Sequence, residues 1–198
     1  MRSIVTISGS SRANSFTARA LAIVNDELAK SDHQIVSFDA ATLHLDFPGR
    51  PPTPDADRLR LAVKDAVGLV LATPEYHGGM SAMIKLCVES LGFPSDLSGK
   101  PVALLGVAAG RIGAIKSIEQ LRGVCGHVGA FVVPGAISIA NVHSAFDASG
   151  RCTDPSTEAA LRGLATSLLS FVRDYVCPKF ALEAMVRDST GTPWAASV

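Results

Sequence analysis

Apolar runs of strand length alternate along this chain with stretches in which apolar residues recur at helical spacing. The strand-like runs cover residues 4–8, 34–38, 67–73, 102–107 and 130–133. The helical stretches cover residues 15–30, 55–66, 81–91, 114–125 and about 155–175. Such alternation is typical of a three-layer α/β domain, so we expect a five-stranded parallel sheet between two layers of helices.

The runs at 67–73 and 102–107 are apolar throughout, which indicates strands that are buried on both faces. Segments rich in proline or in polar turn residues, 40–53 and 141–154, are expected to be loops. We predict a single domain over residues 1–177. For the tail, residues 178–198, we expect either a crossing to a partner subunit or partial disorder.

Composition narrows the class of protein. The 198 residues are 47% apolar and 18% charged, and 18 basic side chains balance 18 acidic ones. A neutral chain offers no basic surface for nucleic acid, and no apolar run is long enough to span a bilayer. The four cysteines have no Cys-x-x-Cys spacing and no secretory signal is found, so we expect reduced thiols in a cytoplasmic protein.

The segment from residue 7 to residue 17 joins the first strand to the first helix. It contains Gly9, the hydroxyls of Ser10, Ser11 and Ser15, and the guanidinium of Arg12. Backbone N–H groups at a helix start attract anions, hydroxyls add neutral donors, and an arginine can pair with a phosphate through two hydrogen bonds. The pattern predicts a phosphate site. The alternative is an ordinary helix cap beside a solvated arginine.

A second unusual loop follows the third strand. Pro74 fixes the backbone, Gly78 lets it approach a ligand closely, and Tyr76 and His77 offer flat surfaces with polar tips. A tight turn from strand to helix is the alternative. In a parallel sheet, ligands bind beyond the carboxyl ends of the strands, where the loops 9–17, 74–80 and 108–113 are expected to meet.

Two motifs together resemble the NAD(P)H-dependent FMN reductase family. They are Gly9-Ser10-Ser11-Arg12-x-x-Ser15 and Thr73-Pro74-Glu75-Tyr76-His77-Gly78-Gly79-Met80-Ser81, the latter followed by Ile84-Lys85. The resemblance covers about residues 1–175. It implies a flavodoxin-like fold with strand order 2-1-3-4-5 and one FMN per subunit.

Carried over residue by residue, the resemblance places the FMN phosphate at the first motif and the isoalloxazine at the second. The implied FMN-binding residues are Ser10, Arg12, Ser15, Phe16, Thr17, Pro74, Glu75, Tyr76, His77, Gly78, Gly110 and Arg111. Two positions depart from the family pattern, since it commonly has asparagine where this chain has Thr17 and His77. The departure at His77 puts the flavin potential and its pH response in question more than FMN binding.

The activity implied is hydride transfer from NADH or NADPH through FMN to a small acceptor such as a flavin or a quinone. This chemistry needs positioning more than a protein acid or base, so we expect no catalytic residue and read Glu75 as an orienting or helix-start carboxylate. Arg111 is either a partner for a nicotinamide nucleotide phosphate or a solvated loop arginine.

Two other functions use the same fold. A flavodoxin-type electron carrier would bind FMN without a nicotinamide site, but carriers favour acidic surfaces and lack the Pro-Glu-Tyr loop. A redox-sensing or scaffolding protein would bind flavin with negligible turnover. No metal site is expected, because His33, His44, His127 and His143 have no ligand partners at metal spacing and fit surface or capping roles.

The helix predicted at 81–91 has more apolar residues than one core-facing stripe needs. They are Met80, Met83, Ile84, Leu86, Cys87, Val88 and Leu91. We therefore expect this helix to pack against the same helix of a second subunit, in a homodimer or a homotetramer.

Overall fold

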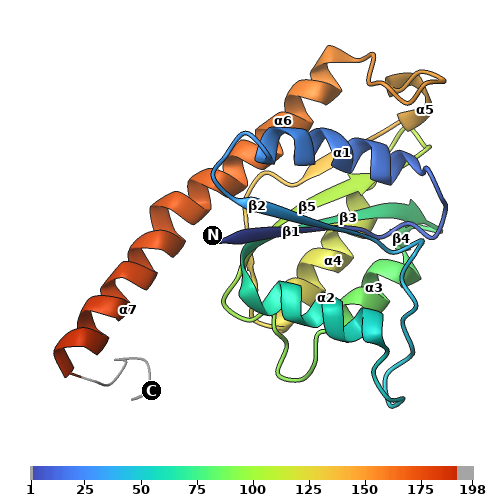
Figure 1. The fold of residues 1–198 in the computed structure, drawn as a ribbon. Coiled ribbons are helices and arrows are strands. Elements are labelled where there is room, and N and C mark those ends of the chain that lie inside the picture. The colour runs from blue at the N-terminus through green and yellow to red at the C-terminus, as the bar shows by residue number, and fades with distance from the viewer. Residues whose placement is uncertain (1, 191–198) are drawn as a thin grey trace.

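The computed structural model describes residues 2–190 and has three layers, a twisted sheet between two layers of helices (Figure 1). The strands are β1 (Ser3–Ser8), β2 (Gln34–Asp39), β3 (Ala66–Tyr76), β4 (Gly79–Met80), β5 (Pro101–Val107), β6 (Phe131–Val132) and β7 (Ile137–Ile139). The helices are α1 (Phe16–Leu28), α2 (Pro54–Asp65), α3 (Ala82–Glu89), α4 (Ile115–His127), α5 (Val142–Ala145), α6 (Pro155–Phe171) and α7 (Cys177–Thr190), with a π-helical turn (Val172–Val176) between the last two.

The main sheet is parallel, with the order β2-β1-β3-β5-β6. This confirms the predicted order 2-1-3-4-5, with one correction at the fifth strand. That strand is interrupted after residue 132 and resumes as β7, which also pairs with β5. Pro134 has no N–H to give to a ladder and Gly135 has a φ of +85°, so the chain breaks its pairing there.

Helices α1 and α6 cover one face of the sheet and α2, α3 and α4 cover the other (Figure 1). Consecutive residues of the central strand alternate between the two cores. Val70 and Ala72 belong to the cluster under α1 and α6, whereas Leu69 and Leu71 belong to the cluster under the other three helices. All seven residues of β5 and the first nine of β3 are buried, which confirms that these strands are covered on both faces.

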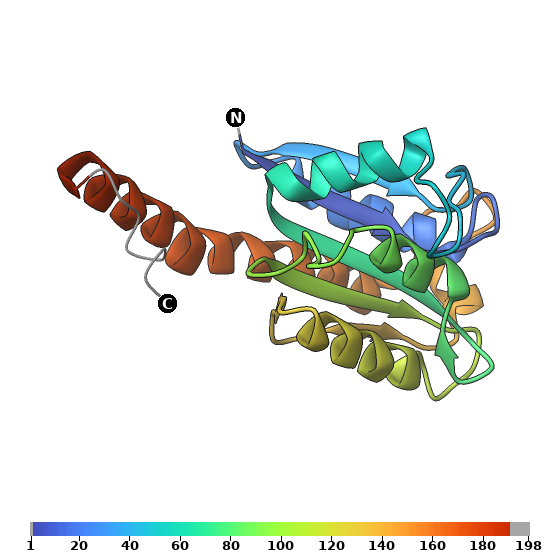
Figure 2. The same ribbon diagram turned by 90° about the horizontal axis from the view of Figure 1, so that it is seen from below.

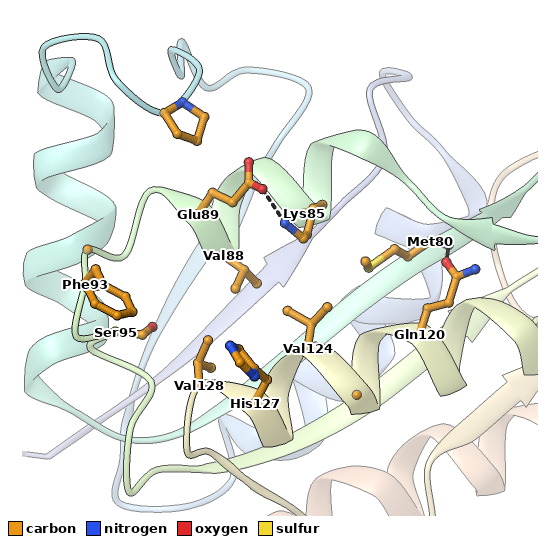
Figure 3. A pocket seen from close by; sticks show the side chains of 13 residues that line it. Met80, Lys85, Val88, Glu89, Phe93, Ser95, Gln120, Val124, His127 and Val128 are labelled. Carbon is orange, nitrogen blue, oxygen red and sulfur yellow. Dashed lines mark hydrogen bonds and ion pairs between the residues drawn. The ribbon is translucent and has the colours of Figure 1, made fainter.

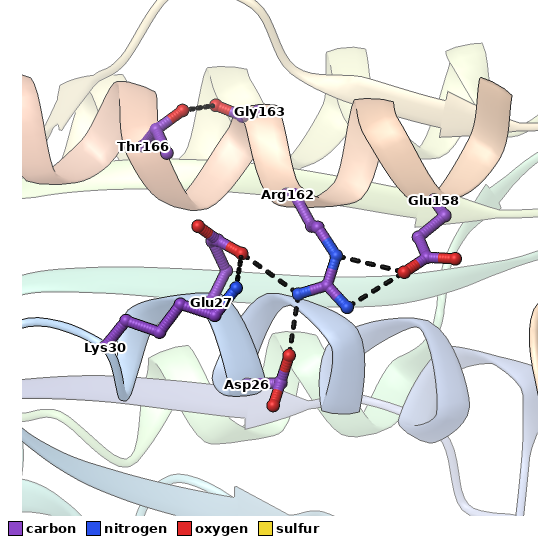
Figure 4. Close-up of polar contacts among 7 residues, drawn as sticks. All are labelled: Asp26, Glu27, Lys30, Glu158, Arg162, Gly163 and Thr166. Atoms are coloured by element: carbon purple, nitrogen blue, oxygen red, sulfur yellow. Dashed lines mark hydrogen bonds and ion pairs between the residues drawn. The ribbon is translucent and has the colours of Figure 1, made fainter. Parts of the chain in front are cut away.

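An ion-pair network fastens α1 to α6 (Figure 4). The guanidinium of Arg162 on α6 lies 2.6 Å from Asp26 and 3.0 Å from Glu27, both on α1, and 2.9 Å from Glu158 one turn earlier on its own helix. The pKa of Asp26 is lowered, mainly by its hydrogen bond from Arg162. The pKa of Glu27 is lowered as well, mainly by its hydrogen bond from Lys30. The network fixes the helix whose first turn borders the predicted phosphate site.

The chain departs from expectation at its C-terminal end. The last helix was predicted to end near residue 175, but it continues through the π-helical turn into α7 and reaches Thr190. Figures 1 and 2 show α7 extending away from the sheet. Of the tail that we expected to cross to a partner or to be partly disordered, residues 178–190 are thus helical, and residues 191–198 lie outside the described part. No described helix combines the length and the apolarity required to cross a bilayer.

Candidate functional site

The start of α1 is built to receive an anion. Ser15 caps the helix, with its Oγ accepting a hydrogen bond from the Ala18 N–H at 3.1 Å. The next two amides, of Phe16 and Thr17, donate to no group among the described residues. Buried Ser10 shapes the preceding loop, its Oγ accepting from the Arg12 N–H at 3.2 Å. Two free amides at a positive helix end favour a phosphate group there.

The first loop is joined to the helix that follows β3. The hydroxyl of buried Ser81 donates to the Gly9 carbonyl and accepts from the Ile84 N–H at 3.1 Å. A Cβ added to Gly9 would lie 2.5 Å from the Cβ of Ile84 and 2.9 Å from the Ala72 carbonyl oxygen. Gly9 is therefore required by close packing against α3, and the two motifs of the sequence form one packed unit.

Residues 75–80 form a β-hairpin, whereas the sequence predicts a loop there. Glu75 pairs with Met80 and Tyr76 with Gly79, in the antiparallel sense. The two turn residues, His77 and Gly78, have φ values of +50° and +74°. Positive φ at both positions is the type I′ turn, for which Asn-Gly is the preferred sequence. The backbone thus explains why the family pattern has asparagine where this chain has histidine.

Helix α4 holds this hairpin in place through two hydrogen bonds. The Ser117 N–H, in the first turn of α4, donates to Glu75 Oε2 at 3.1 Å, and the Met80 N–H donates to Gln120 Oε1 at 3.1 Å. The Glu75 carboxylate therefore binds a helix start, which is one of the two roles predicted for it.

A cavity of about 430 Å³ lies between the two loops. Its walls are formed by Ser10, Arg12, Ala13, Asn14, Ser15, Phe16, Thr17, Pro74, Glu75, Tyr76, Val107, Ala109, Val142 and His143. The Arg12 guanidinium lies over the Tyr76 ring, 5.4 Å from its centroid. Eight of the twelve residues predicted to bind FMN are thereby brought together, all from the first two loops.

The other four predicted residues do not line this cavity. His77 and Gly78 occupy the hairpin turn, with Gly78 close to the side chain of Lys116 on α4. Gly110 and Arg111 are exposed in the loop after β5. Of the loop after β5, Ala109 lines the cavity, whereas Gly110 and Arg111 do not.

Sequence reasoning missed the wall contributed by the segment after β7, and near the end of β5 it selected Gly110 and Arg111 where Val107 and Ala109 line the cavity. Val107 and Ala109 lie at the end of β5 and just beyond it, and Val142 and His143 follow β7. The signal available was their position at the carboxyl edge of the sheet. His143, assigned a surface or capping role from the sequence, packs edge-on against Phe16, with ring centroids 4.8 Å apart and an interplanar angle of 86°.

The donor set of the cavity fits a phosphate monoester. Arg12 forms no ion pair among the described residues, and the amides of Phe16 and Thr17 are free. Apolar walls and the Tyr76 ring suit the planar part of such a ligand. Among the described residues, no three or more His, Cys, Asp or Glu side chains are grouped so that they could hold a metal ion.

A second hollow, of about 630 Å³, lies between α3 and α4 (Figure 3). Met80, Val88, Val124 and Val128 supply apolar walls, and the Phe93 side chain at its edge is 99% exposed. Most of the apolar residues on which the predicted subunit contact was based are buried in the domain itself. They are Ile84, Leu86, Cys87, Val88 and Leu91. The exposed apolar part of this face comes from both helices and the loop after α3.

Comparisons with known proteins agree on one family of reductases. The model of the NADPH-dependent FMN reductase family matches residues 2–144. An NAD(P)H-dependent FMN reductase of Pseudomonas aeruginosa is 30% identical over 181 residues, which cover 86% of this chain and 95% of the relative. A 2-hydroxy-1,4-benzoquinone reductase of a Burkholderia species is 30% identical over 182 residues, covering 86% and 96%.

Solved structures show the same fold. A flavoenzyme NAD(P)H:acceptor oxidoreductase from Paracoccus denitrificans superposes with a TM-score of 0.71 at 22% identity, covering 88% of this chain and 99% of the other. A flavodoxin from the domain Archaea superposes with a TM-score of 0.60 at 12% identity, covering 87% and 99%. The flavodoxin-like architecture expected from the resemblance is confirmed.

Proposed function

The chain belongs to the NADPH-dependent FMN reductase family, and on that premise we propose that it is an FMN-dependent NAD(P)H oxidoreductase that reduces a flavin, quinone or azo acceptor. The observation that carries the proposal is the cavity at the start of α1. It combines two free helix amides, an arginine without an ion-pair partner and an aromatic wall.

The phosphate end of FMN is assigned to the first loop. The unpaired amides of Phe16 and Thr17 lie at the positive end of α1 and are assigned as donors to the phosphate. Arg12 supplies a full positive charge. The hydroxyls of Ser10, Ser15 and Thr17 border the same space. Because Ser10 and Ser15 already accept backbone hydrogen bonds, their hydroxyl hydrogens remain available to donate to phosphate oxygens.

The ring end is assigned to the hairpin. Pro74 and Tyr76 form the wall, and the hydrogen bonds from Ser117 to Glu75 and from Met80 to Gln120 keep that wall fixed on α4. His77 and Gly78 shape the turn, and we assign Gly110 and Arg111, both exposed in the loop after β5, to the far side of the ring. Arg111 is available to a nicotinamide nucleotide phosphate.

When bound, FMN would supply the redox chemistry, which is hydride transfer between NAD(P)H and the acceptor. The protein's part is to bind, to orient and to leave one ring face open. Glu75 Oε2 accepts the Ser117 N–H, which fits an orienting carboxylate, and we expect no protein acid or base to take part. Positioning without a protein acid or base is consistent with a broad class of small acceptors.

The test is reduction of the bound cofactor. Protein reconstituted with FMN is mixed under argon with NADPH or with NADH, and the flavin absorbance is followed. Bleaching within seconds with either nucleotide is expected. A flavodoxin-type carrier would stay oxidised with both. Arg12→Ala should weaken FMN binding by roughly tenfold or more, as expected for the loss of a charge-assisted pair, while Arg50→Ala, in a distant loop, should not change it.

A second copy of the chain is proposed to dock on the face between α3 and α4. Its support is the apolar hollow there, together with a Phe93 side chain exposed to 99%. Sedimentation of the wild type should show a dimer or a tetramer. Phe93→Glu should shift it to a smaller species, whereas Leu61→Glu, on the exposed face of α2, should leave the assembly unchanged.

A cytoplasmic location is also proposed. Its support is the set of four free cysteines, two of them buried, which suits a reducing compartment. Fractionation of cells that produce the protein would test it.

A further inference from the structure

His143 is the titratable side chain that the predicted site did not include. It lies on the short helix α5, directly after β7. The helix is anchored, because Val142 and Ala145 are buried and the Val142 N–H donates to the Ala108 carbonyl at 3.1 Å. The exposed imidazole lines the cavity and packs edge-on against Phe16.

The contact with Phe16 places the imidazole at one end of the cavity. Phe16 is the first residue of α1, and its amide is one of the two free donors. His143 therefore stands beside the helix start, where the phosphate is assigned, and not beside Tyr76 at the ring end.

The charges around the cavity leave a phosphate incompletely balanced. A phosphate monoester carries about −1.5 to −2 charges at neutral pH. The lining supplies one permanent cation, Arg12, and the carboxylate of Glu75 is bound to the Ser117 amide. Arg19 lies over the Phe16 ring, 5.0 Å from its centroid, and is not among the lining residues.

We propose that protonated His143 donates an N–H to the phosphate of FMN, so that the cofactor is bound more tightly as the imidazole gains its proton. Histidine changes charge close to neutral pH, unlike the arginine and the helix amides of the same site. This inference rests on the proposed function. It adds a binding residue from the segment after β7 and makes cofactor loading dependent on pH.

The experiment measures the dissociation constant of FMN between about pH 6 and pH 8.5, from the quenching of flavin fluorescence. It compares the wild type with His143→Gln and with His44→Gln, which removes an exposed imidazole from a distant loop. The phosphate of FMN also titrates near pH 6, but it does so equally for every protein compared. The ratio of the dissociation constants of the variant and the wild type therefore reports the effect of His143 alone.

We expect His143→Gln to weaken FMN binding about fivefold at the lower pH, the effect of one partly exposed charge pair, and little at the higher pH. His143→Lys, with a permanent charge, should keep tight binding at both. Riboflavin, which lacks the phosphate, should bind the wild type and His143→Gln alike, and His44→Gln should behave as the wild type.

Three results would overturn the inference. One is a ratio of constants that does not change with pH, the second an equal loss for FMN and riboflavin, and the third a His143→Lys variant that binds FMN no better than His143→Gln at pH 8.5. In each case FMN binding by the wild type would still support the proposed function. A wild type that binds no FMN at any pH would overturn both.

Discussion

The guanidinium of Arg12 lies 5.4 Å from the centroid of the Tyr76 ring, which places the charge of the first loop over the aromatic wall of the second. A cation above an aromatic face is held there by the ring quadrupole. The contact spans the cavity between the two motifs. It pre-orients the side chain assigned to the phosphate and the side chain assigned to the ring.

Removing the Tyr76 ring should therefore weaken FMN binding. For Tyr76→Ala we expect a loss of about tenfold in affinity, because both the stacking surface and the support for Arg12 disappear. Tyr76→Phe keeps the ring and should bind FMN within about twofold of the wild type. Fluorescence titration of the three proteins measures this. Equal affinities for Tyr76→Ala and the wild type would contradict the placement of the flavin ring.

Gly9→Ala tests the packing of the first loop on α3. The new methyl group would meet Ile84 Cβ at 2.5 Å and the Ala72 carbonyl oxygen at 2.9 Å, so backbone must move. We expect the free energy of unfolding to fall by about 1–3 kcal/mol, as for other overpacked sites, and FMN affinity to fall with it. Denaturant titration measures the first effect.

The matched control is Gly163→Ala, in the middle of α6, where an added Cβ has no heavy atom within 4 Å. Alanine is the better helix former, so this variant should gain about 0.5–1 kcal/mol. A Gly9→Ala protein as stable as the wild type would show that the contact with Ile84 is not tight.

His77 occupies a backbone conformation that suits asparagine better. At φ +50° and followed by Gly78, it fills the first central position of a type I′ turn. We expect His77→Asn to raise the free energy of unfolding by a few tenths of a kcal/mol, and His77→Val to lower it by about 1–2 kcal/mol, since a β-branched residue is strained there. Thermal unfolding of the three proteins measures this order of stability. A His77→Val protein at least as stable as His77→Asn would show that the turn is of another type.

Local sequence signals predicted the elements that build the site. The helix start near Ser15 and the apolar runs of β3 and β5 are each encoded within a few residues, and the structure confirms them. The hairpin at 75–80 was missed because His-Gly is a rarer I′ turn than Asn-Gly.

The remaining differences depend on contacts between distant segments. Pro178 does not stop the last helix: a π-helical turn precedes it and the helix continues as α7, whose Phe180 ring lies 4.6 Å from the Arg2 guanidinium. The approach of His143 to Phe16 follows from the register of β7 on β5, which no local pattern encodes.

Asp154 gives a prediction about pH. It caps α6, and hydrogen bonds from the side chains of Thr157 and Ser156, with the backbone N–H of Ser156, hold its pKa below the usual value. A carboxyl whose pKa is lower in the folded state stabilises the fold above its unfolded pKa of about 3.9. That contribution is lost as the pH falls through the folded value.

Asp154→Ala should therefore unfold at lower denaturant concentration than the wild type at pH 7, and the two midpoints should converge as the pH falls below about 4. Asp32→Ala is the control, because the exposed Asp32 side chain forms no hydrogen bond or ion pair within the described residues, and its midpoint should follow the wild type throughout. A gap that stays constant down to acid pH would mean that Asp154 acts through packing and not through its charge.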